Sequence, residues 1–168
     1  MDRSLWMSLM LGPAALWIAL AAAALVVAAR GTDPERLKRV VAPALTTVAL
    51  QAAHFGEEFA TGFHRRFFPQ LGLAPWPDAL FAGFNLAWIA VWLIAVGAAA
   101  ARRASGPAAT VLTFLAIAAV VNGIVHPLLS LRAGGYFPGL FSSIPLALGG
   151  LWLWRRLAAS GRRPVAGA

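Results

Sequence analysis

The chain has 168 residues, of which 60% are hydrophobic and 12% charged, and its mean hydropathy is +0.74. A soluble domain of this length needs a polar outer shell, and this composition holds too little polar material to build one. The composition therefore excludes an ordinary soluble domain. It indicates one membrane domain, residues 1–168, that uses the lipid bilayer as its solvent.

The net charge of +8 does not indicate a nucleic-acid partner, because the 14 Lys and Arg residues form short clusters between apolar runs and no single basic face. Such clusters are typical of the topology signals of membrane proteins. The chain has no cysteine, which excludes disulfides, thiolate metal ligands and Cys nucleophiles. Any bound metal must have nitrogen and oxygen ligands.

Five apolar segments each approach the ~20 residues that a helix needs to cross a ~30 Å hydrocarbon core. They predict an all-α bundle of about five transmembrane helices, over residues 5–29, 40–63, 78–101, 107–131 and 136–157. The first segment is too long for a signal peptide and is predicted to be an uncleaved helix. Residues 30–39 and 64–77 are predicted loops.

The basic residues set the predicted orientation. With five spans, one side of the membrane holds four of them, namely Arg3, Arg65, Arg66 and Arg132. The other side holds ten, namely Arg30, Arg36, Lys38, Arg39, Arg102, Arg103, Arg155, Arg156, Arg162 and Arg163. Because Lys and Arg accumulate in cytoplasmic loops, we expect the N-terminus outside and the C-terminus in the cytoplasm. Abundant Ala, Gly and Arg with a single Lys favour a GC-rich bacterium, and hence its cell (inner) membrane.

The second predicted helix carries a polar stripe at spacings typical of one helix face. Its members are Thr47, Gln51, His54, Glu58 and Thr61. A carboxylate facing lipid would cost several kcal/mol, so the stripe is expected to face the bundle interior or a water-filled cavity. Glu57 lies at the edge of the stripe, about 100° around the helix from Glu58, so the two carboxylates need not do the same job.

Two other predicted helices bring polar groups to the same depth. At a rise of ~1.5 Å per residue, His54 and Asn122 lie ~22 Å past the cytoplasmic boundary, and Glu58 and His126 lie ~28 Å past it. Asn85 enters from the opposite side and lies ~10 Å below the outer boundary. In a ~30 Å core these levels coincide, which predicts a single site.

Two imidazoles and one or two carboxylates suit zinc, or alternatively iron or manganese. The predicted ligands are His54, Glu58 and His126, since residues one helical turn apart can share a metal. A carboxylate that is not a ligand, Glu57 or Glu58, could act as general base on a bound water.

A metal-free site is also consistent with the sequence. His54 and Glu58 could then form an acid/base pair, and Asn85 or Asn122 could orient the substrate or stabilise an oxyanion. The alternative to any chemistry is a structural hydrogen-bond network between helices, a common role of polar residues such as Asn85. Trp92 is either core packing or the floor of a substrate pocket. Tyr136 is either an interfacial residue or a substrate-side proton donor above the site.

The segment His54-Phe55-Gly56-Glu57-Glu58 resembles the signature of the HXXEE family of uncharacterised multi-pass membrane proteins. The resemblance continues in residues 122–126, an Asn-x-x-x-His element, and in residues 136–140, a Tyr-x-Pro-Gly element. It implies a membrane metal-binding or enzymatic site, and it names no substrate. The site residues that it implies are His54, Glu57, Glu58, Asn122 and His126.

These patterns predict a membrane metal-dependent, hydrolase-like enzyme that acts on a lipidic or lipid-soluble substrate. Its predicted catalytic residues are Glu57, Glu58 and Asn122, and its predicted substrate-binding residues are Asn85, Trp92 and Tyr136. One alternative is a metal-free isomerase similar to the five-helix sterol isomerases, which only the spacing of His54 and Glu58 supports. The other is a proton or metal-ion transporter, against which the small size and the lack of an inverted repeat argue.

Overall fold

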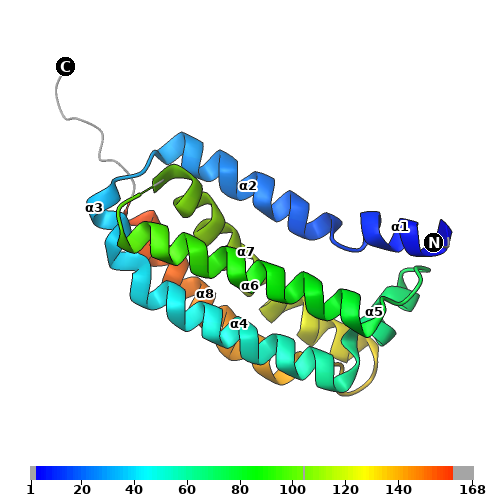
Figure 1. Cartoon of the computed structure of the whole chain (residues 1–168). Coiled ribbons are helices and arrows are strands. Elements are labelled where there is room, and N and C mark those ends of the chain that lie inside the picture. Colours follow the sequence, from blue (N-terminus) through cyan, green and yellow to red (C-terminus); the bar gives the residue numbers. More distant parts are fainter. Residues whose placement is uncertain (1–2, 104, 161–168) are drawn as a thin grey trace.

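The computed structural model describes residues 3–103 and 105–160, and within them it confirms the all-α prediction. Figure 1 shows the long helices running side by side, with α3 at one end of the bundle and α5 at the other. The elements in chain order are α1 (Arg3–Leu11), α2 (Ala14–Arg30), α3 (Pro34–Leu37), the 3₁₀ helix η1 (Lys38–Val40), α4 (Val41–Thr61), α5 (Phe63–Gln70), α6 (Asp78–Ala100), α7 (Ser105–Arg132) and α8 (Leu140–Ala158).

Three helical segments among the described residues are long and apolar enough to cross a membrane: Ser4–Arg30, which joins α1 and α2, then α6 and α7. Helices α4 and α8 are less apolar, because α4 carries the polar stripe and α8 ends in Arg155 and Arg156. The count of five spans, and the orientation that depends on it, therefore stay predictions. Arg162 and Arg163, which entered the charge count, lie outside the described residues.

Three of the predicted boundaries are wrong in the first half of the chain. The loop expected over residues 30–39 contains the short helices α3 and η1. The helix expected over residues 5–29 breaks between α1 and α2, at Gly12 and Pro13, because a proline inside a helix removes a hydrogen bond and clashes with the preceding turn. The loop expected over residues 64–77 contains the short helix α5. Helix α4 ends before it at Gly62, whose φ of 74° is a left-handed conformation that glycine adopts without strain.

The last helix begins four residues later than expected. Residues 136–139 form a turn, because Gly139 has a φ of 88° and caps the start of α8. This turn matters for the site, because it brings the backbone between α7 and α8 against the polar stripe of α4.

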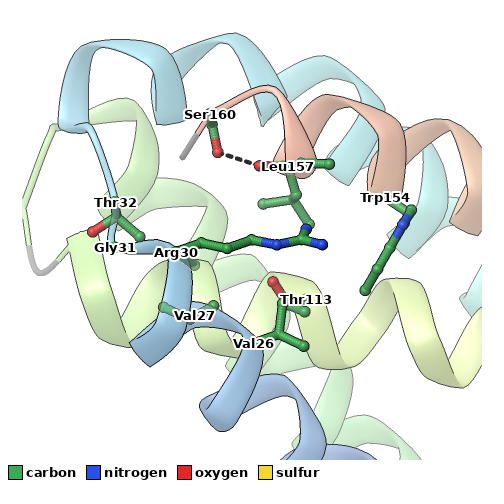
Figure 2. Close-up of a pocket in the computed structure, with 11 residues that line it drawn as sticks. Val26, Val27, Arg30, Gly31, Thr32, Thr113, Trp154, Leu157 and Ser160 are labelled. Carbon is green, nitrogen blue, oxygen red and sulfur yellow. Dashed lines mark hydrogen bonds between the residues drawn. The ribbon is translucent and has the colours of Figure 1, made fainter. Parts of the chain in front are cut away.

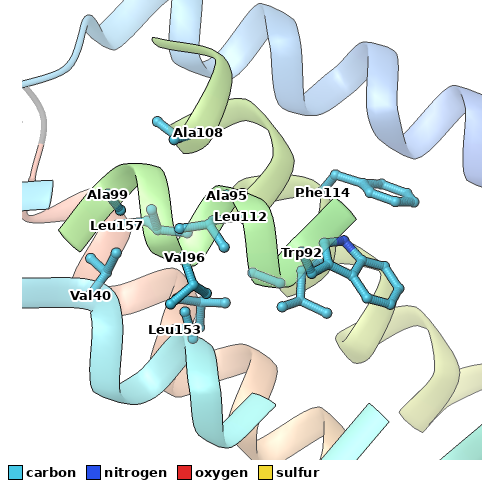
Figure 3. Close-up of a cluster of buried hydrophobic side chains, with 14 of the residues drawn as sticks. Val40, Trp92, Ala95, Val96, Ala99, Ala108, Leu112, Phe114, Leu153 and Leu157 are labelled. Atoms are coloured by element: carbon cyan, nitrogen blue, oxygen red, sulfur yellow. The ribbon is translucent and has the colours of Figure 1, made fainter. Parts of the chain in front are cut away.

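The core lies toward the α3 end of the bundle and consists mainly of small and aliphatic side chains, together with the aromatic rings of Trp92 and Phe114 (Figure 3). Helices α4, α6, α7 and α8 supply most of it, and α2, α3 and η1 contribute the rest. Helices α7 and α8 approach closely because one of them presents a glycine. A Cβ added to Gly150 would lie 2.7 Å from the Ala119 Cβ and 2.9 Å from the Ala116 carbonyl oxygen. Such contacts between small residues are typical of helix packing in membranes.

At the same end, a small cavity of about 20 Å³, roughly the size of one water, lies between α2, α7 and α8 (Figure 2). The guanidinium of Arg30 lies 5.6 Å from the ring centroid of Trp154. The backbone N–H of Asp33 donates to the carbonyl of Ser160 at 3.3 Å and so ties the segment after α2 to the end of α8. No histidine or carboxylate lines this cavity, so it offers no metal site.

The close packing of α7 on α8 predicts that Gly150→Ala destabilises the protein by about 1–3 kcal/mol, because the added methyl group overpacks the interface. Thermal unfolding in detergent, followed by size-exclusion chromatography, measures the effect. Gly97→Ala is the matched control, since a Cβ at Gly97 meets nothing within 4 Å. Equal stability of the two variants would contradict the packing described for α7 and α8.

Candidate metal site

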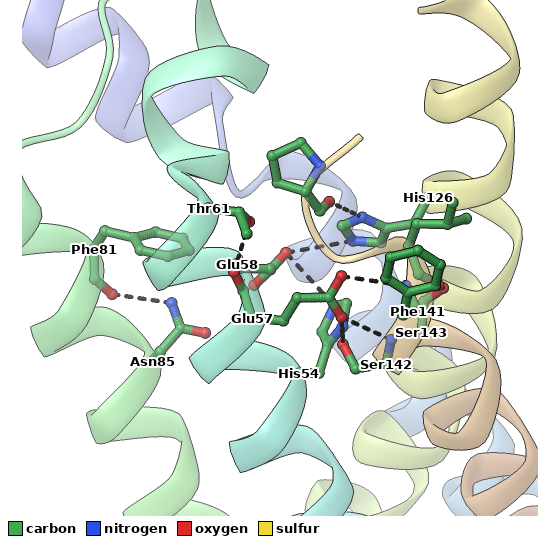
Figure 4. A network of polar contacts seen from close by, with 12 residues as sticks. His54, Glu57, Glu58, Thr61, Phe81, Asn85, His126, Phe141, Ser142 and Ser143 are labelled. Carbon is green, nitrogen blue, oxygen red and sulfur yellow. Dashed lines mark hydrogen bonds and ion pairs between the residues drawn. The ribbon is translucent and has the colours of Figure 1, made fainter. Parts of the chain in front are cut away.

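The structure brings the three predicted metal ligands together in the interior (Figure 4). The Oε1 atom of Glu58 lies 3.5 Å from Nε2 of His54, one turn earlier on α4, and 3.3 Å from Nε2 of His126 on α7. All three side chains are buried, and their ligand atoms lie within 4.8 Å of one another. This buried group, here called the triad, could hold a metal ion.

The proton of the His126 ring can be placed from its neighbour. Its Nδ1 lies 2.7 Å from the carbonyl oxygen of Pro138, in the turn before α8. A carbonyl oxygen only accepts hydrogen bonds, so Nδ1 carries the hydrogen and donates it. In a neutral ring, Nε2 then presents its lone pair to Glu58.

The same reasoning places the proton of His54. Its Nδ1 lies 2.9 Å from Oγ of Ser142, and the Ser142 hydroxyl donates its only hydrogen to the carboxylate of Glu57. The Ser142 oxygen must therefore accept from Nδ1–H of His54. That leaves a second lone pair, on Nε2 of His54, facing Glu58. This nitrogen has no hydrogen-bond partner among the described residues.

With both rings neutral, the Glu58 carboxylate and two imidazole lone pairs thus face one another in a buried place, where a metal ion could join them. The distances of 3.3 and 3.5 Å are longer than the ~2.7–2.9 Å of a charge-assisted hydrogen bond. They match the ~3.4 Å that separates two ligand atoms around a tetrahedral ion with bonds of about 2.1 Å. Two His and one Glu are also a ligand set that catalytic zinc sites use. The residues could therefore hold a metal ion.

Glu57 serves a different part of the structure. Its carboxylate accepts hydrogen bonds from the Tyr136 hydroxyl at 2.7 Å, the Phe141 N–H at 3.2 Å, the Ser142 N–H at 2.7 Å and the Ser142 hydroxyl. These donors lie at the N-terminus of α8, where the helix dipole favours a negative charge. Glu57 reaches the triad only through Ser142.

Tyr136 lies in the turn between α7 and α8 and is partly exposed. Burial and the nearby Glu57 carboxylate raise the pKa of its hydroxyl above the ordinary value, so the hydroxyl stays protonated and donates to Glu57. Tyr136 is not among the residues that line the large cavity beside the triad. Tyr136 therefore supports Glu57 by donating a hydrogen bond to its carboxylate.

The large cavity has a volume of about 240 Å³ and lies between α4, α5, α6, α7 and the break between α1 and α2. Glu58 and His126 line it, and so do the predicted site residues Asn85, Asn122 and Trp92. Half of its remaining lining residues are aromatic, including Phe63, Phe81, Phe84, Trp88 and Phe114. An apolar cavity with a few polar groups at one wall suits a lipid-soluble molecule.

Sequence reasoning missed the residues that hold the two rings, Ser142 and the carbonyl of Pro138. A serine in the first turn of a helix directly after Pro-Gly was the available signal, because serines there often bond to nearby groups. Asn85 lines the cavity, and its amide donates to the carbonyl of Phe81 on its own helix at 2.9 Å (Figure 4).

His64, the third histidine of the chain, lies apart from the triad. It is buried, stacks on Phe59 and Phe81, and bonds Asp78 at the start of α6 with an Nε2–Oδ1 distance of 2.8 Å. Arg65 also bonds Asp78. These contacts give His64 a structural partner of its own.

Comparison with known proteins gives no relative: no family model matches the chain, and no curated protein or solved structure matches it. What the site does is therefore inferred from its own geometry.

The hydrogen bond from His54 to Ser142 predicts that Ser142→Ala weakens metal binding about 10- to 100-fold, because a ligand ring loses the group that fixes its orientation and proton. Titration of the purified protein with Co²⁺, followed by visible absorption, measures the affinity. Ser143→Ala is the control, since Ser143 donates only to the Leu140 carbonyl of the same turn. Equal Co²⁺ affinity in both variants would show that Ser142 does not support the site.

Proposed function

We propose that the protein is an integral membrane, metal-dependent enzyme of the hydrolase type that acts on a lipidic or lipid-soluble substrate. One observation carries the proposal: the buried Glu58 carboxylate lies between two imidazole nitrogens whose lone pairs both face it. The aromatic cavity beside it supports the substrate class.

We propose that all five long helical segments cross the membrane, with the N-terminus outside. Helix α8 qualifies because its exposed charges, Arg155 and Arg156, lie in its last turn, where they can reach the membrane boundary. Helix α4 qualifies because all members of its stripe but Thr61 are buried inside the bundle, which removes most of the penalty for polar residues in lipid. The triad then lies near the outer side of a bacterial cell membrane.

In this proposal His54, Glu58 and His126 bind zinc, or alternatively iron or manganese. Such an ion supplies Lewis acidity, which activates water and polarises the bond to be cleaved. Asn122 lies on α7 one turn before His126 and lines the cavity, where its amide can orient the substrate. Glu57 is a positioning residue, because it holds Ser142 and through it the His54 ring.

We also propose that the chain belongs to the HXXEE family. All three sequence elements of that resemblance contribute to one place in the fold. Residues 54–58 supply two triad members, residues 122–126 supply the third, and residues 136–140 supply the carbonyl that orients His126. This convergence supports the resemblance as more than a chance match of short motifs.

Metal content tests the binding half of the proposal. Elemental analysis of protein purified in mild detergent is expected to find about one zinc, iron or manganese ion per chain, because three neutral or anionic donors converge. His54→Ala and His126→Ala are expected to lose it. His64→Gln is the matched control and should keep it, since His64 bonds Asp78 instead.

A wild-type protein that stays metal-free after incubation with each ion would overturn the metal-dependent function. If that protein also retained a bound lipid against His54 and Glu58, a metal-free isomerase would take its place. Size-exclusion chromatography of each variant separates loss of metal from loss of the fold.

Activity tests the hydrolytic half. The zinc-loaded protein is expected to hydrolyse p-nitrophenyl decanoate in detergent, and a chelator should abolish the reaction. Glu58→Gln should lower the rate by about 100-fold or more, because the buried anion that the chemistry needs is removed. Glu35→Gln is the control, since Glu35 is exposed and pairs with Arg102 at the other end of the bundle. Equal rates for the two variants would contradict the role of Glu58.

A further inference from the structure

The large cavity reaches the surface of the bundle on one side. All but two of the residues that line it are buried or half-buried. The two exceptions are Ala15, in the first turn of α2, and Val121 on α7, which is 40% exposed. Both side chains are apolar. They mark the side on which the cavity comes to the surface, between α2 and α7.

Aromatic contacts close the other sides. At the α5 end, the rings of Phe68 and Trp76 stack at a centroid distance of 4.9 Å, and both side chains are buried. The Trp76 N–H donates to the hydroxyl of Ser8 at 3.0 Å, so α1 holds this cover in place. On the α6 side, Trp17 of α2 contacts Trp88 at a centroid distance of 6.1 Å. Among the described residues, these contacts leave the side between α2 and α7 as the opening.

The opening faces the hydrocarbon of a bilayer. The segments on its two sides, Ser4–Arg30 and α7, are both long and apolar enough to cross a membrane. Ile124 and Leu128 follow Val121 on α7, and both are exposed and apolar. The opening is therefore continuous with a surface that lipid chains cover. A molecule that passes through it comes from the bilayer.

Inside, the cavity is polar near the triad and mainly apolar at its deep end. Four polar side chains line it near the triad, namely Asn85, Asn122, Glu58 and His126. Phe114 also lines it and precedes His126 by twelve residues, which places it ~18 Å deeper along α7. Trp92 follows Asn85 by seven residues, or ~10 Å along α6. At this depth the cavity is lined mainly by aromatic rings, together with the buried Gln51.

The rings of Trp92 and Phe114 form the floor of the deep end. Their centroids lie 6.0 Å apart, both side chains are buried, and Figure 3 shows them at the edge of the apolar core. Trp88 contacts both rings, at centroid distances of 5.8 and 4.7 Å. Small and aliphatic side chains of the core pack beyond them. The cavity ends at this floor.

We infer that the cavity binds one hydrocarbon chain of a membrane lipid, which enters from the bilayer between α2 and α7. The polar head faces Asn122 and the triad, and the chain ends against Trp92 and Phe114. A lipid in the leaflet nearer the triad already has this direction, with its head at the boundary and its chain toward the bilayer centre. The inference deepens the proposed function and rests on it only for the reaction at the head.

The length of the cavity suits a chain of about ten carbons. An extended chain advances ~1.2 Å per bond, so ten carbons span roughly 11 Å. About 7 Å of the ~18 Å between the levels of His126 and Phe114 then remains for the polar head and the floor rings.

A brominated probe tests where the chain ends, because bromine quenches the fluorescence of a tryptophan that it contacts. The probe is 10-bromodecanamide, which has a neutral head and carries bromine at the end of its chain. Added to the full chain in lipid nanodiscs, it is expected to quench a saturable part of the tryptophan fluorescence. In Trp92→Phe this saturable part should decrease. Trp152→Phe is the control and should keep it, since Trp152 is exposed on α8.

The isomer 2-bromodecanamide carries its bromine beside the head. Any saturable quenching by this isomer should be the same in wild type and in Trp92→Phe, because the bromine stays near the triad. Dependence on Trp92 that is equal for the two isomers would overturn the inference. Absence of saturable quenching by 10-bromodecanamide would overturn it as well.

A second pair of variants tests the entrance. Val121→Phe narrows the opening and should slow the saturable quenching by about tenfold or more in stopped-flow measurements, because the chain must displace the added ring. Ile124→Phe is the matched control, since Ile124 is exposed on the same helix and is not among the residues that line the cavity. Equal rates in the two variants would show that the chain does not enter between α2 and α7. Size-exclusion chromatography confirms that both variants are folded.

The inference and the proposed function fail separately. The titrations are run on metal-loaded protein and on protein treated with a chelator. Saturable quenching that depends on Trp92, in a protein that binds no metal, would leave the inference standing and remove the metalloenzyme. Stoichiometric metal without saturable quenching would do the reverse.

Discussion

The arrangement of this end of the bundle depends on the buried carboxylate of Glu58 and the two imidazole nitrogens that face it. Each ring donates its Nδ1 hydrogen to another group: His126 to the carbonyl of Pro138, and His54 to the Ser142 hydroxyl oxygen. What remains is an anion surrounded by lone pairs, a combination that is unfavourable in a low-dielectric interior unless a cation joins it. A metal ion or a shared proton would relieve this, and the three side chains could hold a metal ion.

The backbone around the site is shaped by the need to approach two rings closely. The turn before α8 passes directly against them, and a Cβ on Gly139 would lie 3.0 Å from Cε1 of His54 and closer still to the His126 ring. Gly139 also has a positive φ, which a residue with a side chain would adopt with strain. The Pro-Gly element thus has a steric role: the proline supplies the acceptor for His126, and the glycine leaves room for both imidazoles.

The sequence predicted the parts of this site that follow from helical periodicity. The stripe on α4 placed Glu58 beside His54, and the helical rise placed His126 at the same depth. The sequence predicted Glu57 as a catalytic residue and could not predict its hydrogen bonds to Tyr136, Phe141 and Ser142, because these depend on which helix packs against that side of α4. Ser142 belongs to a helix whose start depends on the turn at Gly139. The break at Pro13 was visible in the sequence, but the long apolar run around it favoured one continuous helix.

The adjacent carboxylates of Glu57 and Glu58 have different surroundings, and only Glu58 belongs to the group that could hold a metal ion. Both belong to the same motif, and a rotation of about 100° along the helix separates their surroundings. Glu57 meets four hydrogen-bond donors at the start of α8, so its charge is satisfied by the protein itself. Glu58 faces the Nε2 atoms of two imidazole rings instead. The Glu57 carboxylate holds Ser142 at the start of α8. Because Ser142 accepts the Nδ1 hydrogen of His54, the Nε2 lone pair of that ring faces Glu58. Glu57 therefore orients the residues around the site, and Glu58 is itself a candidate metal ligand.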